Sequence, residues 1–141
     1  MIMGEARDQQ SCRAAAMEHS DLVRVKKVKG KGRGVFARRD IARGTVIERA
    51  PVALLPMKYL VDGKNCPVLA KYFYAWNRST VAIALGFGSL YNHSYAPNAI
   101  YSDRNLTIIY RALRNIAAGD EITVNYNGKP NDNRPMDFDV V

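Results

Sequence analysis

Short apolar runs separated by glycine-containing turns are the feature that most restricts how this sequence can fold. From Leu22 onward no apolar run is long enough for an extended core helix, and turn residues follow almost every run. The pattern predicts a mainly β protein, built from several small sheets of short strands with very little helix. Residues 68–76 fit either a short helix or an aromatic strand. The strands expected from β-branched and alternating residues lie at 22–28, 35–38, 45–55, 81–85, 99–101, 106–111 and 121–126.

The length and composition indicate one globular domain with no separate cofactor domain. The chain has 141 residues, of which 48% are hydrophobic and 24% charged. Residues 1–20 lack a clear period and are expected to form a flexible extension. They contain no apolar core of signal-peptide length, and no apolar run in the chain approaches a membrane span. We therefore expect a soluble, intracellular protein without membrane contact.

Cysteine and histidine are too sparse and too scattered to suggest a metal site. The two cysteines are Cys12 and Cys66, and the two histidines are His19 and His93. None of them has the spacing of a zinc site. We expect free thiols and no bound metal.

The positive charge of the chain is concentrated in one stretch. The net charge is +8, and between Arg24 and Arg49 ten Lys or Arg residues stand against only Asp40 and Glu48. Such a stretch can form a patch for nucleic acid, nucleosomes or another polyanion. It can equally be the solvated surface of strands, and charge alone does not decide between the two.

One phrase, a turn followed by a strand, occurs twice. Residues 41–47 read Ile-Ala-Arg-Gly-Thr-Val-Ile, and residues 116–122 read Ile-Ala-Ala-Gly-Asp-Glu-Ile. In each copy the glycine, Gly44 or Gly119, can take a positive φ and release the chain into a strand. Two copies of this length do not indicate a repeat protein.

Three further segments carry residues suited to chemistry, although each has an ordinary structural reading. The Gly-Arg-Gly of residues 32–34 lets a ligand approach the backbone closely, but it also suits a hairpin turn. The Asn-His-Ser and Pro-Asn of residues 92–98 can be a polar loop that holds strands together, because clustered polar groups must be satisfied internally. Residues 119–126 can be a plain strand after a turn.

Together, in this order and spacing, the three segments resemble the SET domain, a family of protein-lysine methyltransferases. The likeness extends over about residues 22–127 and is greatest to the compact viral and bacterial members that lack a post-SET zinc cluster. It implies a SET-domain fold over 21–127 with a C-terminal pseudoknot, S-adenosylmethionine as cofactor and Tyr126 as the catalytic centre. The cofactor-binding residues that the resemblance implies are Gly32, Arg33, Gly34, Asn92, His93 and Tyr126.

The resemblance also implies a narrow channel through which the substrate lysine reaches the cofactor. Tyr101 is a second catalytic candidate, and the channel residues expected from the family are Tyr72, Phe87, Tyr101 and Val124. The Cys-x-Cys of the post-SET cluster is absent after Asn127, so residues 128–141, including Phe138, are the material available to cap the channel. The Arg-Phe often found before the Asn-His pair is Ser89-Leu90 here.

Two other functions and several substrates stay open from the sequence. The chain can be a non-catalytic SET-like protein that binds a partner, or a small basic β-protein that binds nucleic acid. As a methyltransferase it needs a protein substrate with an exposed lysine, either a histone tail or a bacterial ribosomal or DNA-binding protein. The protein would then be cytoplasmic in bacteria, or nuclear and chromatin-associated in a eukaryotic cell. A homodimer is expected to cover apolar surface around residues 81–85 and the rim of the channel.

Overall fold

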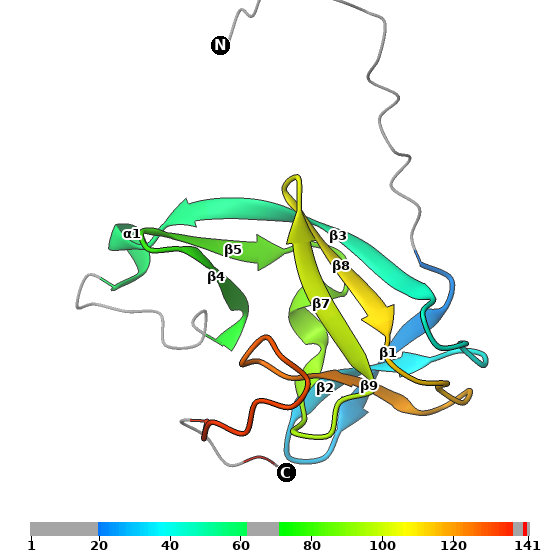
Figure 1. Ribbon diagram of the computed structural model, residues 1–141. Coiled ribbons are helices and arrows are strands. Elements are labelled where there is room, and N and C mark those ends of the chain that lie inside the picture. The colour runs from blue at the N-terminus through cyan, green and yellow to red at the C-terminus, as the bar shows by residue number, and fades with distance from the viewer. Residues whose placement is uncertain (1–19, 62–70, 137–139, 141) are drawn as a thin grey trace, which may run out of the picture.

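The computed structural model describes residues 20–61, 71–136 and 140, and within them the chain is mainly β (Figure 1). A four-stranded sheet has the order β1-β2-β9-β6, and a five-stranded sheet has the order β4-β5-β3-β8-β7. The named helical elements of the described ranges are the short α1 (Lys58–Val61) and the 3-10 helix η2 (Gly88–Leu90). The strands are β1 (Val23–Val28), β2 (Gly32–Ala37), β3 (Val46–Pro56), β4 (Phe73–Asn77), β5 (Thr80–Ala84), β6 (Asn92–His93), β7 (Ala99–Arg104), β8 (Thr107–Ala112) and β9 (Glu121–Val124). The predicted mainly β architecture of several small sheets is confirmed.

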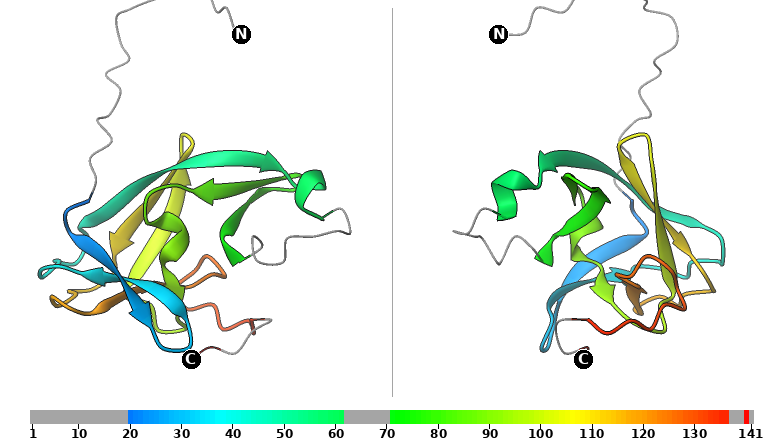
Figure 2. Two further views of the ribbon diagram at one scale, coloured as in Figure 1. Left: turned by 180° about the vertical axis from the view of Figure 1, so that it is seen from behind. Right: turned by 60° about the vertical axis from the view of Figure 1, so that its left-hand side comes forward.

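The two sheets lie across each other and enclose the core. In Figures 1 and 2 the long strand β3 arches over β5 and β8, while β1, β2 and β9 form the opposite side of the molecule. Period-two alternation directs one face of each strand inward, as in β8, where Ile108 and Tyr110 are buried and Arg111 is exposed. Val35 and Ile122 fill the other side of the same core.

The two copies of the repeated phrase pair with each other. Ile41 and Ile116 form an antiparallel bridge in which each amide donates to the other carbonyl, at 2.8 and 2.9 Å. The glycine of each copy has a positive φ, +83° at Gly44 and +92° at Gly119, as the sequence predicts. The repeat is therefore a local two-fold arrangement that joins distant parts of the chain.

The side chains that precede the two copies act reciprocally as well. Oδ1 of Asp40 accepts a hydrogen bond from the amide of Ala118 at 2.8 Å. Oδ1 of Asn115 accepts one from the amide of Arg43 at 2.9 Å. Each turn is thus capped by a residue that introduces the other turn.

The C-terminal strand β9 lies between β2 and β6, and this brings the three motif segments together. β6 runs parallel to β9, with His93 opposite Val124. The Asn98 side chain ties the following loop to the same strand, because it donates to the carbonyl of Glu121 at 2.8 Å and accepts from the amide of Thr123 at 2.9 Å. The polar 92–98 segment therefore holds strands together, and it does so at the centre of the site described below.

Some of the sequence predictions fall on residues outside the described ranges. The predictions for 68–76 and for the apolar surface at 81–85 can be compared with the structure. Residues 1–19, Cys66 and Phe138 lie outside them, and of the ambiguous 68–76 segment the structure describes the strand β4. Val81 and Ala84 are buried within the chain, so Leu85, 46% exposed, is the main apolar contribution of 81–85 to the surface. That segment gives little reason for a dimer. No helix of the described ranges is long and apolar enough to cross a membrane.

Candidate active site

A pocket of about 1130 Å³ lies where the β1–β2 hairpin, β4, β6 and the C-terminal segment meet. Seven of the site residues predicted from the sequence line it, although they come from five separate segments. None of the described residues that line the pocket is acidic. The predicted residues found there are Gly32, Arg33, Tyr72, Asn92, His93, Tyr101 and Tyr126.

Tyr126 lies two residues after the end of β9 and is held through both its backbone and its side chain. Its amide donates to Nδ1 of His93 at 3.1 Å, and its hydroxyl donates to the carbonyl of Tyr91 at 2.7 Å. Burial is the main cause that raises the pKa of the Tyr126 hydroxyl to about 12. The residue as a whole is still 38% exposed. Tyr126 therefore presents a protonated hydroxyl at the wall of an open pocket.

Three more tyrosines extend this wall behind Tyr126. The Tyr101 hydroxyl donates to the Tyr126 carbonyl at 3.2 Å, and its ring stands edge-on to that of Tyr74 at 5.2 Å. The hydroxyls of Tyr74 and Tyr110 lie 2.7 and 2.8 Å from the Gly88 carbonyl and 2.8 Å from each other. Burial raises the pKa of both hydroxyls, which remain neutral donors.

Asn92 joins the glycine loop to the last strand. Its Nδ2 donates to Oε1 of Glu121 at 2.6 Å and to the carbonyl of Arg33 at 3.0 Å. A Cβ added at Gly34 would lie 2.5 Å from Oε1 of Glu121 and 2.9 Å from Nδ2 of Asn92. Only glycine fits this close approach, whereas a Cβ at Gly32 would meet no atom within 4 Å.

Gly34, Phe87 and Val124 were also predicted as site residues but do not line the pocket. Gly34 packs against Asn92 behind the pocket wall. Val124 is fully buried, because the alternation of β9 directs it into the core. Phe87 is half-buried, and its amide donates to the carboxylate of Glu48 at 2.8 Å. These three residues support the site from behind.

Other pocket residues were not among the predicted ones. Lys31 and Lys71 bring positive charge to the pocket, and Tyr91 precedes Asn92 directly. The position of Tyr91 beside the Asn-His pair is a signal that could have identified it. Nothing local in the sequence marks Glu48, which reaches the same region from β3.

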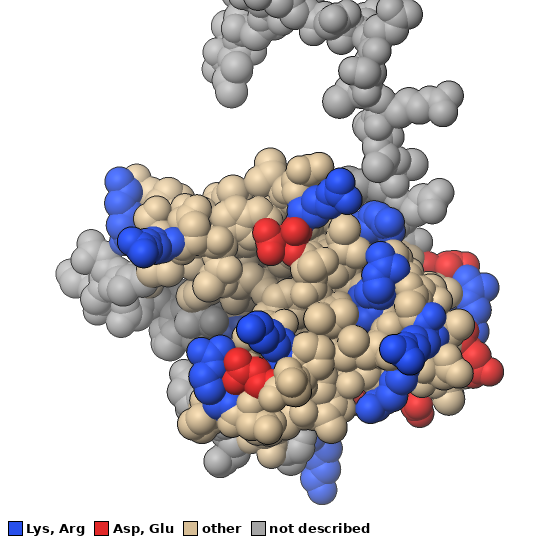
Figure 3. Space-filling model, in the orientation of Figure 1, with Lys and Arg blue, Asp and Glu red and all other residues tan. Residues whose placement is uncertain are grey.

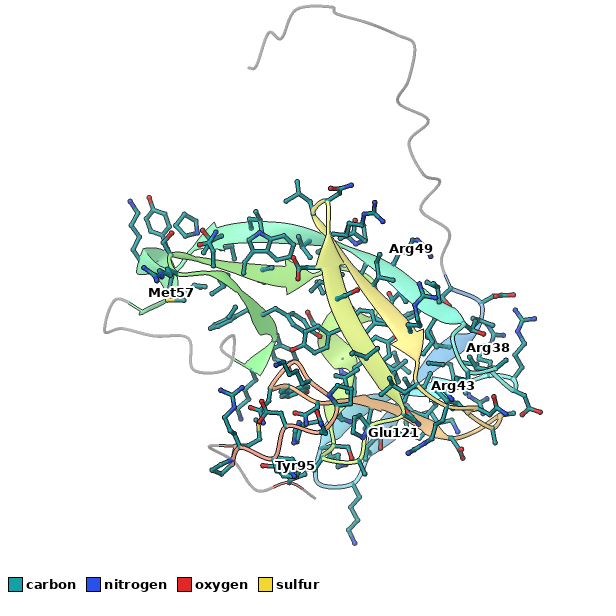
Figure 4. All side chains as sticks on the ribbon, in the orientation of Figure 1. Arg38, Arg43, Arg49, Met57, Tyr95 and Glu121 are labelled. Atoms are coloured by element: carbon teal, nitrogen blue, oxygen red, sulfur yellow. The ribbon has the colours of Figure 1, made fainter. Side chains whose placement is uncertain are left out.

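The C-terminal segment folds back toward the pocket. Nδ2 of Asn127 donates to the Arg134 carbonyl at 2.9 Å. The Tyr95 hydroxyl donates to the same carbonyl at 3.2 Å and accepts from the amide of Met136 at 3.1 Å. Met136 and Val140 then line the pocket, and Figure 4 shows Tyr95 beside this segment.

The sequence and the fold of this chain are similar to those of known proteins that share this arrangement of strands and motifs. The family model of the SET domain matches residues 32–127. A histone-lysine N-methyltransferase of Schizosaccharomyces pombe, described as specific for lysine 37 of H3, is 37% identical over 98 residues, which are 68% of this chain and 67% of the relative. The crystal structure of a Plasmodium falciparum protein described as a histone methyltransferase superposes with a TM-score of 0.61 at 28% identity, covering 74% of this chain and 91% of the other.

The fold and the matched residues define a class of protein. The chain belongs to the SET-domain family of protein-lysine methyltransferases. The resemblance stated from the three motif segments is thereby confirmed.

Proposed function

We propose that this protein transfers a methyl group from S-adenosylmethionine to the ε-amine of a histone lysine. The observation that carries the proposal is the convergence of Tyr126, the Asn92-His93 strand and the glycine hairpin on one pocket. The histone-lysine methyltransferase relative supports a histone as the substrate class. The two alternatives, a partner-binding SET protein and a nucleic-acid-binding protein, give no reason for these residues to meet.

The residues that line the pocket fit S-adenosylmethionine. The volume of about 1130 Å³ suits a ligand of this size. The backbone at Gly32 faces open space, and Lys31 and Arg33 offer positive charge for a carboxylate. The His93 ring lies beside the Tyr126 ring, with centroids 5.3 Å apart, and Asn92 lines the same pocket. When bound, the cofactor supplies a methyl group attached to positively charged sulfur.

The substrate lysine must lose its proton before it can accept the methyl group. With a pKa of about 10.4, roughly one lysine in a few thousand is neutral at pH 7. The rings of Tyr72, Tyr101 and Tyr126 can exclude water around the amine, and burial of this kind lowers the pKa of an amine. The described residues that line the pocket include Lys31, Arg33 and Lys71 and no acid, and this supports the same shift. The Tyr126 hydroxyl donates its proton to the Tyr91 carbonyl, so it can orient the amine by accepting a hydrogen bond from the amine N–H.

Two finer features of the proposal concern the surroundings of the pocket. Residues 128–141 cap the substrate channel in place of a post-SET cluster, and the hydrogen bonds of Tyr95 and Asn127 to residues 134–136 support this. The basic β1–β2 hairpin contacts nucleic acid bound to the substrate, since residues 22–39 carry no acid. Contact of this kind would place the enzyme on chromatin.

Substitution of Tyr126 by Phe tests the proposed reaction. Tyr126→Phe keeps the buried ring and removes one hydrogen bond, so the free energy of unfolding should change by at most about 1–2 kcal/mol. Methyl transfer should fall about a hundredfold or more, because the hydroxyl acts chiefly in the transition state. The measurement is single-turnover transfer to histone peptides at saturating cofactor, with a thermal melt of each protein.

The outcome separates the alternatives. A folded, cofactor-binding variant with a near-normal rate would remove Tyr126 from the mechanism. A wild-type protein that binds the cofactor but methylates no histone peptide or nucleosome would contradict the proposed substrate.

A further inference from the structure

Glu48 is a buried carboxylate that the proposed reaction does not yet use. It lies on β3 and is only 7% exposed. One oxygen, Oε1, accepts from the amide of Phe87 at 2.8 Å, and the other, Oε2, accepts from the hydroxyl of Tyr91 at 2.8 Å. Burial of a carboxylate is costly unless such hydrogen bonds compensate it. The two bonds hold both ends of one short segment, residues 87–91.

This segment supplies the acceptors for the tyrosines of the pocket. The Tyr91 carbonyl accepts from the Tyr126 hydroxyl at 2.7 Å, and the Gly88 carbonyl accepts from the Tyr74 and Tyr110 hydroxyls. A shift of the segment would therefore move the partner that orients Tyr126. Glu48 does not line the pocket, so any effect on the reaction must pass through these residues.

The packing around Glu48 leaves the segment little room for adjustment. A Cβ at Gly86, where φ is +68°, would lie 2.6 Å from Oε1 of Glu48. The Tyr91 ring stacks on that of Tyr110, with centroids 4.2 Å apart. Burial, and after it the charge of Glu48, raises the pKa of Tyr91, so the Tyr91 hydroxyl stays protonated and can donate. The segment is thus bound to the carboxylate through its backbone and through a side chain.

We propose that Glu48 is a positioning residue that sets the orientation of Tyr126 by holding residues 87–91. The inference rests on the proposed methyl transfer, in which Tyr126 faces the reacting amine. Glu48 contributes to the rate through the Tyr91 carbonyl and makes no contact with the substrate. Removal of the carboxylate should lower the rate of the chemical step while cofactor affinity changes little.

The test combines Glu48→Gln and Tyr91→Phe with Tyr126→Phe. Glu48→Gln keeps the size of the side chain but replaces one acceptor oxygen with a donor group. Tyr91→Phe removes only the hydroxyl and keeps the backbone carbonyl. We expect Glu48→Gln to slow single-turnover transfer about tenfold or more, with the Kd for S-adenosylmethionine within about threefold of wild type. Tyr91→Phe should act in the same direction.

The decisive comparison is made in the Tyr126→Phe background. If Glu48 acts through the Tyr126 hydroxyl, Glu48→Gln should cause almost no further loss of rate there. An equal loss in both backgrounds, or a normal rate in Glu48→Gln alone, would overturn the inference. Should Glu48→Gln fail to fold, the same comparison with Tyr91→Phe decides it.

A readout that needs no activity separates this inference from the proposed function. Amide hydrogen exchange at residues 87–92 should quicken in Glu48→Gln, and the ¹³C NMR shift of Tyr126 Cζ should change. A wild-type protein without methyl transfer would contradict the proposed function alone. Unchanged exchange and an unchanged Tyr126 signal would contradict the positioning role whatever the activity.

Discussion

The Tyr126 hydroxyl keeps its proton far above neutral pH, and this determines the expected pH dependence of the reaction. Its pKa of about 12 lies above that of a free lysine amine. As the pH rises, the neutral fraction of the substrate amine grows while Tyr126 stays protonated. The rate should therefore increase with pH and reach a plateau without declining up to pH about 10. Single-turnover rates from pH 7 to 10 test this, and a decline in a protein still folded by circular dichroism would contradict it.

His93 links the pocket to the stability of the protein. Its Nδ1 accepts from the amide of Tyr126, and burial, followed by the charge of Lys31, lowers the pKa of the imidazole from its usual 6.5. The unfolded chain then binds a proton more readily than the folded one. The contribution of His93 to stability is complete above pH 6.5 and is lost as the pH falls from that value toward the lower pKa of the folded imidazole.

Replacement of His93 by Asn measures this contribution. Asn cannot titrate and can place an oxygen near the position of Nδ1. The melting temperature of wild type should fall more between pH 7.5 and pH 5.5 than that of His93→Asn. Equal falls in thermal denaturation followed by circular dichroism would show that other groups govern the acid response.

A site residue can be predicted from the sequence when its role depends on neighbours within a short motif, and not when it depends on a distant segment. Tyr126, Asn92 and His93 belong to short motifs that carry their own signal, and the structure brings them to one pocket. The role of Glu48 depends on Tyr91, which lies on another element, so no local pattern reveals it. Val124 is buried and does not line the pocket, and the alternation of residues in a strand does not show in advance which face meets the pocket.

Among the elements, the paired turns at Ile41 and Ile116 connect the two halves of the chain. The similarity of the two phrases was visible in the sequence, but their pairing was not. A turn signal predicts a local bend and says nothing about which distant segment satisfies its amides. The strand expected over 121–126 ends at Val124 for a similar reason, since the amide of Tyr126 bonds to His93.

The side chains of Asp40 and Asn115, which cap these turns, should contribute about equally to the free energy of unfolding. Asp40→Ala and Asn115→Ala each remove one hydrogen bond to an amide of the opposite turn. Each should lower the free energy of unfolding by about 1 kcal/mol. Chemical denaturation measures the loss, with Asp103→Ala in the β7–β8 hairpin as a control for removal of an exposed acid. A loss at only one cap, or none beyond the control, would contradict the reciprocal arrangement.

At the scale of the whole molecule, basic side chains are widely exposed. Figure 3 shows several Lys and Arg on the side where Figure 4 labels Arg38, Arg43 and Arg49, with Asp and Glu at its edge, and further Lys and Arg on the opposite side. In the described ranges, the recorded ion pairs are Arg39 with Asp21 and Arg134 with Asp132, so most of this charge faces solvent. An unpaired basic surface of this kind is available to phosphate groups.

Neutralisation of the β1–β2 hairpin should separate capture of the substrate from chemistry. Replacing Lys26, Lys27 and Lys29 with Gln should weaken methylation of nucleosomes several-fold and leave free histone peptides nearly unaffected. The difference should shrink at high salt, because counterions screen phosphate contacts. Lys58→Gln, on α1, is the matched control. An equal loss on both substrates would indicate damage to the fold instead.

The homodimer also stays a prediction, and light scattering at micromolar concentration tests it.

The reciprocal bond between Ile41 and Ile116 also has a consequence for how the chain reaches its native state. Neither turn can complete its hydrogen bonds until the other has arrived from far along the polymer. Closing so long a loop costs entropy before any contact compensates it. Chains dominated by such distant pairings refold in milliseconds to seconds, whereas small helical proteins need only microseconds to milliseconds. The two halves should therefore acquire structure together, late and in a single step.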